Sequence, residues 1–286
     1  MKSAIAEKAL LSGACAVGVV KARKFLELLP ILKKRGPVSF CEKDFEKRIN
    51  PFLIMENAKS IIVCLFSYNT NEKSNISEYA VGEDYHLVIK KRLLPVLQIL
   101  SDNLYRAEIF ADNGPLCDRY LAYLAGLGFF GKNTMLINPE YGSKVFIGYI
   151  LTDCELEPDK PMNNSICMNC MKCVNTCPSH AIGKDFEFNE NVCVSFLTQK
   201  KGALSDKEER FIKSSKYIWG CDICTDVCPY NYSLPITNIQ EFLPSAPYPD
   251  ENLKNLSNKE FNKLYSNKAY SWRGKNILIR NMDICK

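Results

Sequence analysis

The sequence predicts an α+β protein: an α/β layered domain at residues 1–157, a cysteine-rich metal domain at 158–235, and a short tail at 236–286. Three observations lead to this prediction. Short strand-like runs alternate with helical segments in the first half of the chain, eight cysteines follow in closely spaced groups, and the final segment is rich in Asn, Pro, Ser and Lys. A chain of 286 residues with 47% hydrophobic content has room for two domains and a sizeable core.

The composition also bears on compartment and partners. Fourteen cysteines would suggest secretion in a short chain, but this chain is long, and its start, MKSAIAEKAL, lacks the pattern of a cleaved signal. We therefore expect a reducing, cytoplasmic setting, no membrane segment, and a monomer. The formal net charge of +5 is compatible with an anionic partner such as RNA and equally with an ordinary surface.

The first elements alternate between helix and strand. Residues 1–12 place apolar side chains at helical spacing, and Gly13 ends that segment. The segment 33–37, Lys-Lys-Arg-Gly-Pro, predicts a loop. Residues 61–66 are β-branched and apolar over too short a length for a buried helix, so we expect a central strand there.

A longer helix and three further elements follow. Between residues 84 and 104, apolar side chains recur at helical spacing, although Pro95 is expected to kink or divide the helix; the apolar positions are Leu87, Leu94, Leu97 and Leu100. A strand is expected at 107–111, closed by the turn Asp-Asn-Gly-Pro at 112–115. A second helix is expected from about 116 to 127.

Three more elements are predicted downstream. Residues 145–151 form another short strand-like run. Ser205-x2-Glu208 is a capping box that opens a helix reaching about Tyr217, and Ser257-x2-Glu260 is a second capping box.

The cysteines are spaced as iron–sulfur clusters require. The run C-x2-C-x2-C-x3-C-P, which begins at Cys167, is the bacterial ferredoxin pattern, in which three thiolates hold one cubane and the fourth crosses to another. A second run, C-x2-C-x3-C-P, begins at Cys221 and lacks one cysteine, a vacancy that the isolated Cys193 can fill. We therefore expect a ferredoxin-like domain with two [4Fe–4S] clusters, one held by Cys167, Cys170, Cys173 and Cys228 and the other by Cys177, Cys193, Cys221 and Cys224.

A pair of zinc sites is the alternative for these cysteines, because zinc also uses C-x2-C pairs. The two C-P endings favour clusters, since zinc does not call for a proline after the last cysteine of each run. The remaining six cysteines are expected to act as small buried hydrophobes: Cys15, Cys41, Cys64, Cys117, Cys154 and Cys285.

Several linked motifs resemble the epoxyqueuosine reductase family. They are Y-A-x-G-x-D-Y-H at 79–86, D-N-G-P at 112–115, A-G-L-G-x2-G-K-N at 125–133, G-S-x2-F-x-G at 142–148, and the cysteine frame itself. The resemblance runs from about residue 45 to the end of the chain.

The resemblance implies an activity and its cofactors. That family reduces epoxyqueuosine to queuosine in tRNA with cobalamin and two [4Fe–4S] clusters, and it is related to the reductive dehalogenases. By this resemblance the first domain binds cobalamin, and Asp112 matches the acid that supplies a proton as the epoxide oxygen leaves. Such an acid needs a raised pKa to donate near neutral pH. The alternative role for Asp112 is that of a turn residue bonded to the backbone ahead of the next helix.

The resemblance also marks residues expected near the corrin ring. Six positions match: Arg48, Ser195, Asp222, Lys132, Asn133 and Thr134. The glycines before Lys132 are alternatively helix-ending turn residues. The two histidines, His86 and His180, lie outside the motif that places a histidine under cobalt, so no such protein ligand is expected.

The same resemblance suggests partners and leaves rivals open. tRNA is the expected substrate, and a ferredoxin or flavodoxin is the expected electron donor. Basic residues beside the clusters are expected either to meet tRNA phosphates or to form a solvated helix face: Lys200, Lys201, Lys207, Arg210, Lys213 and Lys216. The chain ends about where the family's C-terminal helical-repeat domain begins, so we expect a short form. The rival functions are a dehalogenase-type reductase of a small molecule and a two-cluster electron carrier without catalysis.

Overall fold

The protein is built on a four-stranded antiparallel sheet. The computed structural model describes residues 1–37, 40–162 and 167–286. The strand order is β1-β2-β6-β3, and every neighbouring pair is antiparallel. The strands are β1 (Ala16–Lys21), β2 (Ser60–Ser67), β3 (Ala107–Ala111) and β6 (Val145–Thr152), and a separate small pair joins β4 (Phe129–Phe130) to β5 (Leu136–Ile137). This combination of helices and a sheet agrees with the predicted α+β fold class.

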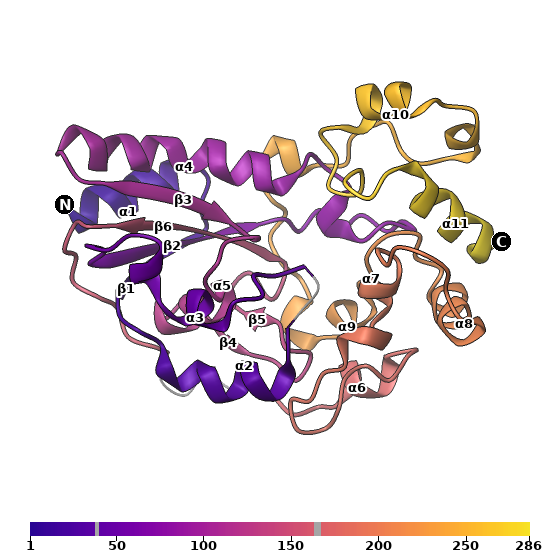
Figure 1. Ribbon diagram of the computed structural model, residues 1–286, viewed down its shortest axis with the longest axis horizontal. Helices are drawn as coiled ribbons and strands as arrows, with labels where there is room; N and C mark the ends of the chain where they lie inside the picture. The colour runs from indigo at the N-terminus through magenta and orange to yellow at the C-terminus, as the bar shows by residue number, and fades with distance from the viewer. Residues whose placement is uncertain (38–39, 163–166) are drawn as a thin grey trace.

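Helices cover both faces of this sheet (Figure 1). On one face lie α1 (Lys2–Leu11) and α4 (Tyr85–Asp102), and on the other lie α2 (Leu29–Arg35), α3 (Phe45–Ile49) and α5 (Asp118–Leu124). Because both faces are covered, every residue of β2 is buried. Successive side chains of a strand point to opposite faces, so β2 supplies two cores at once.

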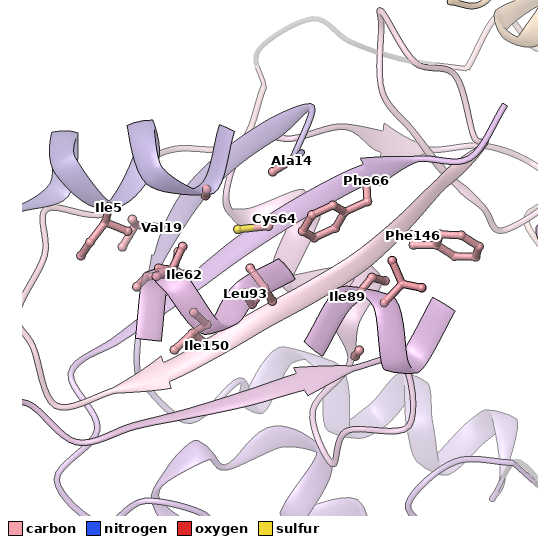
Figure 2. Packing of buried hydrophobic residues seen from close by; sticks show 14 of the residues in the cluster. Ile5, Ala14, Val19, Ile62, Cys64, Phe66, Ile89, Leu93, Phe146 and Ile150 are labelled. Atoms are coloured by element: carbon pink, nitrogen blue, oxygen red, sulfur yellow. The ribbon is translucent and has the colours of Figure 1, made fainter. Parts of the chain in front are cut away.

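The core under α1 and α4 is formed by alternate residues of the central strands. Figure 2 shows Ile62, Cys64 and Phe66 of β2 on the same side as Ile89 and Leu93 of α4. The intervening residues Ile61, Val63 and Leu65 pack in the opposite core with α5. The central strand predicted at 61–66 and the strands predicted at 107–111 and 145–151 are confirmed.

The long helix keeps its continuity but uses a different face from the predicted one. α4 runs unbroken through Pro95, so of the two predicted outcomes, a kink or a division, the division is wrong. Its buried face is Val88, Ile89, Leu93, Val96 and Leu100. Of the four predicted positions, Leu100 is buried as predicted, but Leu87 and Leu94 are more than half exposed. Burial of Leu93 and Val96 on either side of the proline offsets its cost of about 3 kcal/mol.

Two local predictions differ from the structure, and one strand was not predicted. The predicted loop at 33–37 is helical up to Arg35, because three basic residues suit the negative end of α2 before Gly36 ends it at φ +79°. The helix predicted at 116–127 is shorter, since α5 occupies Asp118–Leu124 only. β1 was not predicted, although its valines favour a strand.

The remaining elements form the right-hand part of Figure 1. The cysteine-rich segment carries four helices, and two more follow it: α6 (Lys172–Thr176), α7 (Val194–Leu197), α8 (Asp206–Ser215), α9 (Ile223–Asp226), α10 (Asn258–Tyr265) and α11 (Lys275–Cys285). Both predicted capping boxes are present, at the starts of α8 and α10. In the described ranges, no helix has the length and apolarity to cross a membrane.

The segment after Pro229 packs against the rest of the molecule. Ile239 and Phe242 belong to the core under α1 and α4. Tyr270 and Leu278 form another core with Trp219, which is completely buried. The amide of Asn281 in α11 donates to the backbone carbonyls of Thr198 and Ile218, so α11 is joined to the cysteine-rich segment.

Candidate active site and cysteine clusters

A charged network lies where β3 ends and α4 begins. Asp84 caps α4 by accepting a hydrogen bond from the backbone of His86, which fixes Tyr85 and His86 in the first turn. The Tyr85 hydroxyl donates to the carboxylate of Asp112, the residue that directly follows β3. Asp112 has φ +54°, a strained left-handed conformation that turns the chain towards α4. Three consecutive residues at the start of α4 thus meet the distant Asp112 at one edge of the sheet.

The imidazole of His86 lies between two carboxylates. Its Nδ1 is 2.6 Å from Asp84 Oδ1, and its Nε2 is 3.5 Å from Asp112 Oδ2 and 2.8 Å from the side-chain amide of Asn113. Burial lowers the pKa of His86, but the bonds to Asp112 and Asp84 outweigh burial and raise the pKa to about 9. His86 is therefore an imidazolium at neutral pH, a state in which both ring nitrogens donate and the Asn113 amide presents its oxygen, not its nitrogen, to Nε2.

The protein neighbours of Asp112 shift the pKa of its carboxyl downward. Desolvation raises the pKa of its carboxyl, but hydrogen bonds from His86 and Tyr85 outweigh desolvation and hold the pKa below its ordinary value. The side chain keeps 56% of its surface exposed. In this arrangement the proton resides on His86 and the negative charge on Asp112.

Arg48 and Asp118 lie close to this network. The Arg48 guanidinium bonds to the Cys117 thiol, and its Nε is buried without a hydrogen-bond partner among the described residues. Burial, followed by the negative charge of Asp112, raises the pKa of Asp118 well above its ordinary value. The Arg48 guanidinium therefore lies near two carboxyl groups whose pKa values are shifted in opposite directions, that of Asp112 downward and that of Asp118 upward.

The loop between β4 and β5 connects this region to the cysteines. The Lys132 ammonium donates to the backbone of Lys184 and lies 4.8 Å from the centre of the Phe186 ring. Asn133 is almost completely buried, and its Nδ2 has no acceptor within the part of the chain that is described. At Thr134, the carbonyl accepts from Arg119, the neighbour of Asp118 in α5.

The first group of thiols surrounds a cleft that this loop helps to close. Cys167, Cys170, Cys173 and Cys228 line the cleft together with Gly131, Lys132 and Asn133. Burial raises the pKa of Cys173, and the charges of Cys167 and Cys228 raise it further. Lys132 and Asn133, predicted near the corrin, thus lie against these four cysteines.

The second group of thiols is more deeply placed. Burial raises the pKa of Cys224 well above its ordinary value, and the charges of Cys221, Cys193 and Cys177 raise it further. The amide of Ala181 donates to Cys177 Sγ at 3.3 Å. The first group takes Cys228 from the second run of cysteines, while the second group takes Cys177 from the first run.

Ser195 and Asp222 flank the second group. Burial raises the pKa of Cys193, and the backbone amides of Phe196 and Ser195 lower it by hydrogen bonding to the thiol. The Asp222 carboxylate accepts from Ser77 Oγ at 2.5 Å and from the Glu78 amide at 2.7 Å. Its bonds therefore tie the loop between Cys221 and Cys224 to the segment after β2.

The donor chemistry of the two groups fits iron–sulfur clusters. Each group offers four thiols whose mutual repulsion as thiolates is relieved by bound iron. The unpartnered Asn133 amide in the first group is a donor that cluster sulfur can accept.

Sequence reasoning gave no role to Tyr85 and His86. Both occur in the D-Y-H run at 84–86, but nothing in the sequence indicates that the first turn of α4 faces the end of β3. The sequence signal that could have indicated this network is the adjacent acid, phenol and imidazole at the start of a predicted helix. Among the basic residues expected either to meet tRNA phosphates or to form a solvated helix face, Lys200 forms an ion pair with Glu208 at 2.6 Å.

Comparison with known proteins agrees with this geometry. A family model described as epoxyqueuosine reductase QueG, DUF1730, matches residues 48–113, and one described as a 4Fe-4S double cluster binding domain matches residues 166–231. An epoxyqueuosine reductase of Lactococcus garvieae is 37% identical, with 93% of this chain and 80% of that protein covered.

Solved structures show the same likeness. A crystal structure of epoxyqueuosine reductase with an epoxyqueuosine-modified tRNA-Tyr stem loop superimposes with a TM-score of 0.90 at 32% identity, covering 99% of this chain and 80% of that one. The catabolic reductive dehalogenase NpRdhA gives a TM-score of 0.50 at 17% identity over 80% of this chain and 32% of that one, which is a likeness of fold alone.

Proposed function

Because the chain belongs to the epoxyqueuosine reductase family, we propose that it reduces epoxyqueuosine in tRNA to queuosine, using two [4Fe–4S] clusters and cobalamin. The observation that carries the proposal is the presence in one molecule of two four-thiol groups and an acid–imidazole network at the end of β3. A non-catalytic electron carrier would not need the acid–imidazole network.

The ligand sets follow from the two groups. Cys167, Cys170, Cys173 and Cys228 hold the outer cluster, and Cys177, Cys193, Cys221 and Cys224 hold the inner one. Cys170 is exposed, whereas Cys177 is buried, which supports electron entry at the first group. A ferredoxin or flavodoxin is the proposed donor.

Removal of the epoxide oxygen as water takes two electrons and two protons and leaves a carbon–carbon double bond. The clusters and the cobalamin, when bound, supply the electrons from low-potential metal centres. The chain itself supplies and positions protons. His86, whose proton is present at neutral pH, protonates the Asp112 carboxylate, and Asp112 passes this proton to the departing oxygen; the second proton of the water comes from solvent.

The surroundings of Asp112 support this role. Any group bound over the exposed half of the carboxyl removes water from it and raises its pKa, which favours the protonated acid. Arg48, which bonds to Cys117 just before α5, and the loop at 132–134, whose Thr134 carbonyl accepts from Arg119 of α5, are proposed to contact the cobalamin. The buried, unpartnered Arg48 Nε is a donor that the polar groups of a corrinoid fit.

The proposed setting is the cytoplasm, where thiols stay reduced, and the proposed state is a monomer. All fourteen cysteines are free of disulfides, which supports a reducing compartment.

The direct test uses anaerobically reconstituted protein and tRNA that carries epoxyqueuosine. We expect about eight irons per chain, cobalamin binding, and conversion of epoxyqueuosine to queuosine detected by mass spectrometry of tRNA nucleosides. Asp112→Asn should keep both cofactors and lose turnover by about 10²- to 10⁴-fold. Zinc in place of iron, or cofactor binding without conversion, would contradict the proposal.

A further inference from the structure

Three aromatic side chains and an arginine from distant parts of the chain meet at the surface. The Phe40 ring lies 5.2 Å from Phe196 and 5.5 Å from Trp272, the second pair edge to face. The Arg273 guanidinium lies 3.7 Å from the centre of the Trp272 ring and 5.0 Å from that of Phe40. We call Phe40, Phe196, Trp272 and Arg273 the aromatic shelf.

The shelf is accessible and carries uncompensated positive charge. Trp272 is 54% exposed, which is unusual for a side chain of such large apolar area. No carboxylate in the described ranges forms an ion pair with Arg273, and its Nε has no hydrogen-bond partner there. An exposed aromatic face beside an unpaired cation suits an anionic ligand with a flat ring.

A polar hollow adjoins the shelf at the start of α11. Its volume is about 340 Å³, and Arg273 belongs both to the hollow and to the shelf. The other lining residues are mainly polar: Asn258, Asn262, Lys275 and Asn276, with Phe261 and Gly274. Asparagine amides and a lysine offer the donors and acceptors that phosphates and base edges use.

The shelf also lies near the proposed reaction site. Cys41 directly follows Phe40. Burial raises the pKa of the Cys41 thiol, and the charges of Arg48 and Asp112 also shift that pKa, the first downward and the second upward. Cys41 is therefore close enough to Arg48 and Asp112 to interact electrostatically with both. Phe196 follows Ser195 beside Cys193 of the second thiol group. Arg280 and Asn281 of α11 donate to the backbone carbonyls of Leu197 and Thr198 at the end of α7, the helix that carries Phe196.

We propose that the aromatic shelf binds an unpaired nucleobase of the RNA substrate by stacking on Trp272, while Arg273 and Lys275 contact the adjoining phosphate. This inference rests on the proposed function and names the surface on which the RNA loop is held. Single-stranded RNA fits the combination of flat aromatic faces, cations and a polar hollow. A peptide ligand would leave these cations without a partner unless it were acidic.

The test measures binding of an RNA hairpin whose loop matches the modified anticodon loop. Trp272→Ala should weaken binding roughly 5- to 150-fold, and Trp272→Phe, which keeps a stacking ring, should restore most of it. Arg273→Gln should lower the slope of log affinity against log salt by about 0.7. The matched control is Tyr232→Ala, since Tyr232 is also 54% exposed and has Lys172 over its ring at 5.4 Å.

A second readout uses unmodified protein. The chain has two tryptophans, and Trp219 is completely buried, so quenching of tryptophan emission by the hairpin reports on Trp272. If Trp272→Ala binds the hairpin with wild-type affinity, or if RNA binds without quenching tryptophan emission, the proposed role of the aromatic shelf is wrong. The proposed function would still stand if the protein reduces epoxyqueuosine in tRNA. Failure of the wild-type protein to bind or reduce the RNA would instead remove the proposed function.

Discussion

His86 holds a charge that the sequence alone does not indicate. Its ordinary pKa of 6.5 is raised to about 9 because Asp84 and Asp112 bond to opposite nitrogens of the ring. Because the pKa of His86 is higher in the folded state than in the unfolded state, protonation of His86 stabilises the folded protein. The stabilisation is therefore fully present below about pH 6.5 and is lost as the pH rises through about 9.

We expect His86→Gln to remove this pH dependence. Between pH 6.5 and 9 the urea midpoint of the wild-type protein should fall, while that of the variant should stay nearly level. The turnover of the variant should also be low at every pH, since Asp112 loses its proton source. His180→Gln, at the other and exposed histidine, is the control. Parallel stability profiles of wild type and His86→Gln would contradict the assigned charge.

Residue types and spacings in the sequence identified candidate ligands and a candidate acid, but not their electrostatics. The cysteine runs indicate which thiols belong together because the chemistry of the cluster dictates the spacing. The pKa of Asp112 depends on Tyr85 and His86, which lie 27 and 26 positions earlier and are near it only because α4 starts where β3 ends. Such contacts have no local signature.

At the scale of elements, local patterns predicted strands better than helix faces. The runs at 61–66, 107–111 and 145–151 stand out because buried strands are short and apolar. For α4 the sequence offered several apolar stripes, and the choice among them depends on which side meets the sheet. Pro95 was expected to kink or divide the helix because local propensity ignores the packing that holds the helix on both sides.

The two neighbouring leucines of α4 provide a test of that face. Leu93→Ala should lower the free energy of unfolding by about 2–5 kcal/mol, since Leu93 is completely buried. Leu94→Ala should change it by less than about 0.5 kcal/mol, since Leu94 is 54% exposed. Urea denaturation followed by circular dichroism measures both. Equal effects of the two substitutions would mean that the helix is rotated from its described position.

At the scale of the whole molecule, buried hydrogen bonds join the sheet domain to the second thiol group. Ser77 donates from its hydroxyl to Asp222 and from its amide to the Trp219 carbonyl. Glu78, next in sequence, forms a buried ion pair with Lys144 at 2.5 Å. The inner thiols are therefore held in position partly by residues far outside the cysteine-rich segment.

Ser77→Ala should loosen this connection. Loss of a donor to the buried Asp222 carboxylate is expected to cost about 1–3 kcal/mol of stability and to speed the release of iron to a chelator. Ser214→Ala, in the exposed part of α8, is the control. Unchanged stability and iron release in Ser77→Ala would show that the loop holding Asp222 is fixed by other contacts.

The interleaved order of the cysteines has a consequence for biosynthesis. With the proposed ligand sets, Cys167 leaves the ribosome well before its group is complete, because that group waits for Cys228, and the other group waits for Cys224. A nascent chain stalled anywhere before these positions presents only incomplete sets of thiols. With these ligand sets, metal delivery to both centres follows translation through Cys228, and both centres become ready for assembly within four residues of each other.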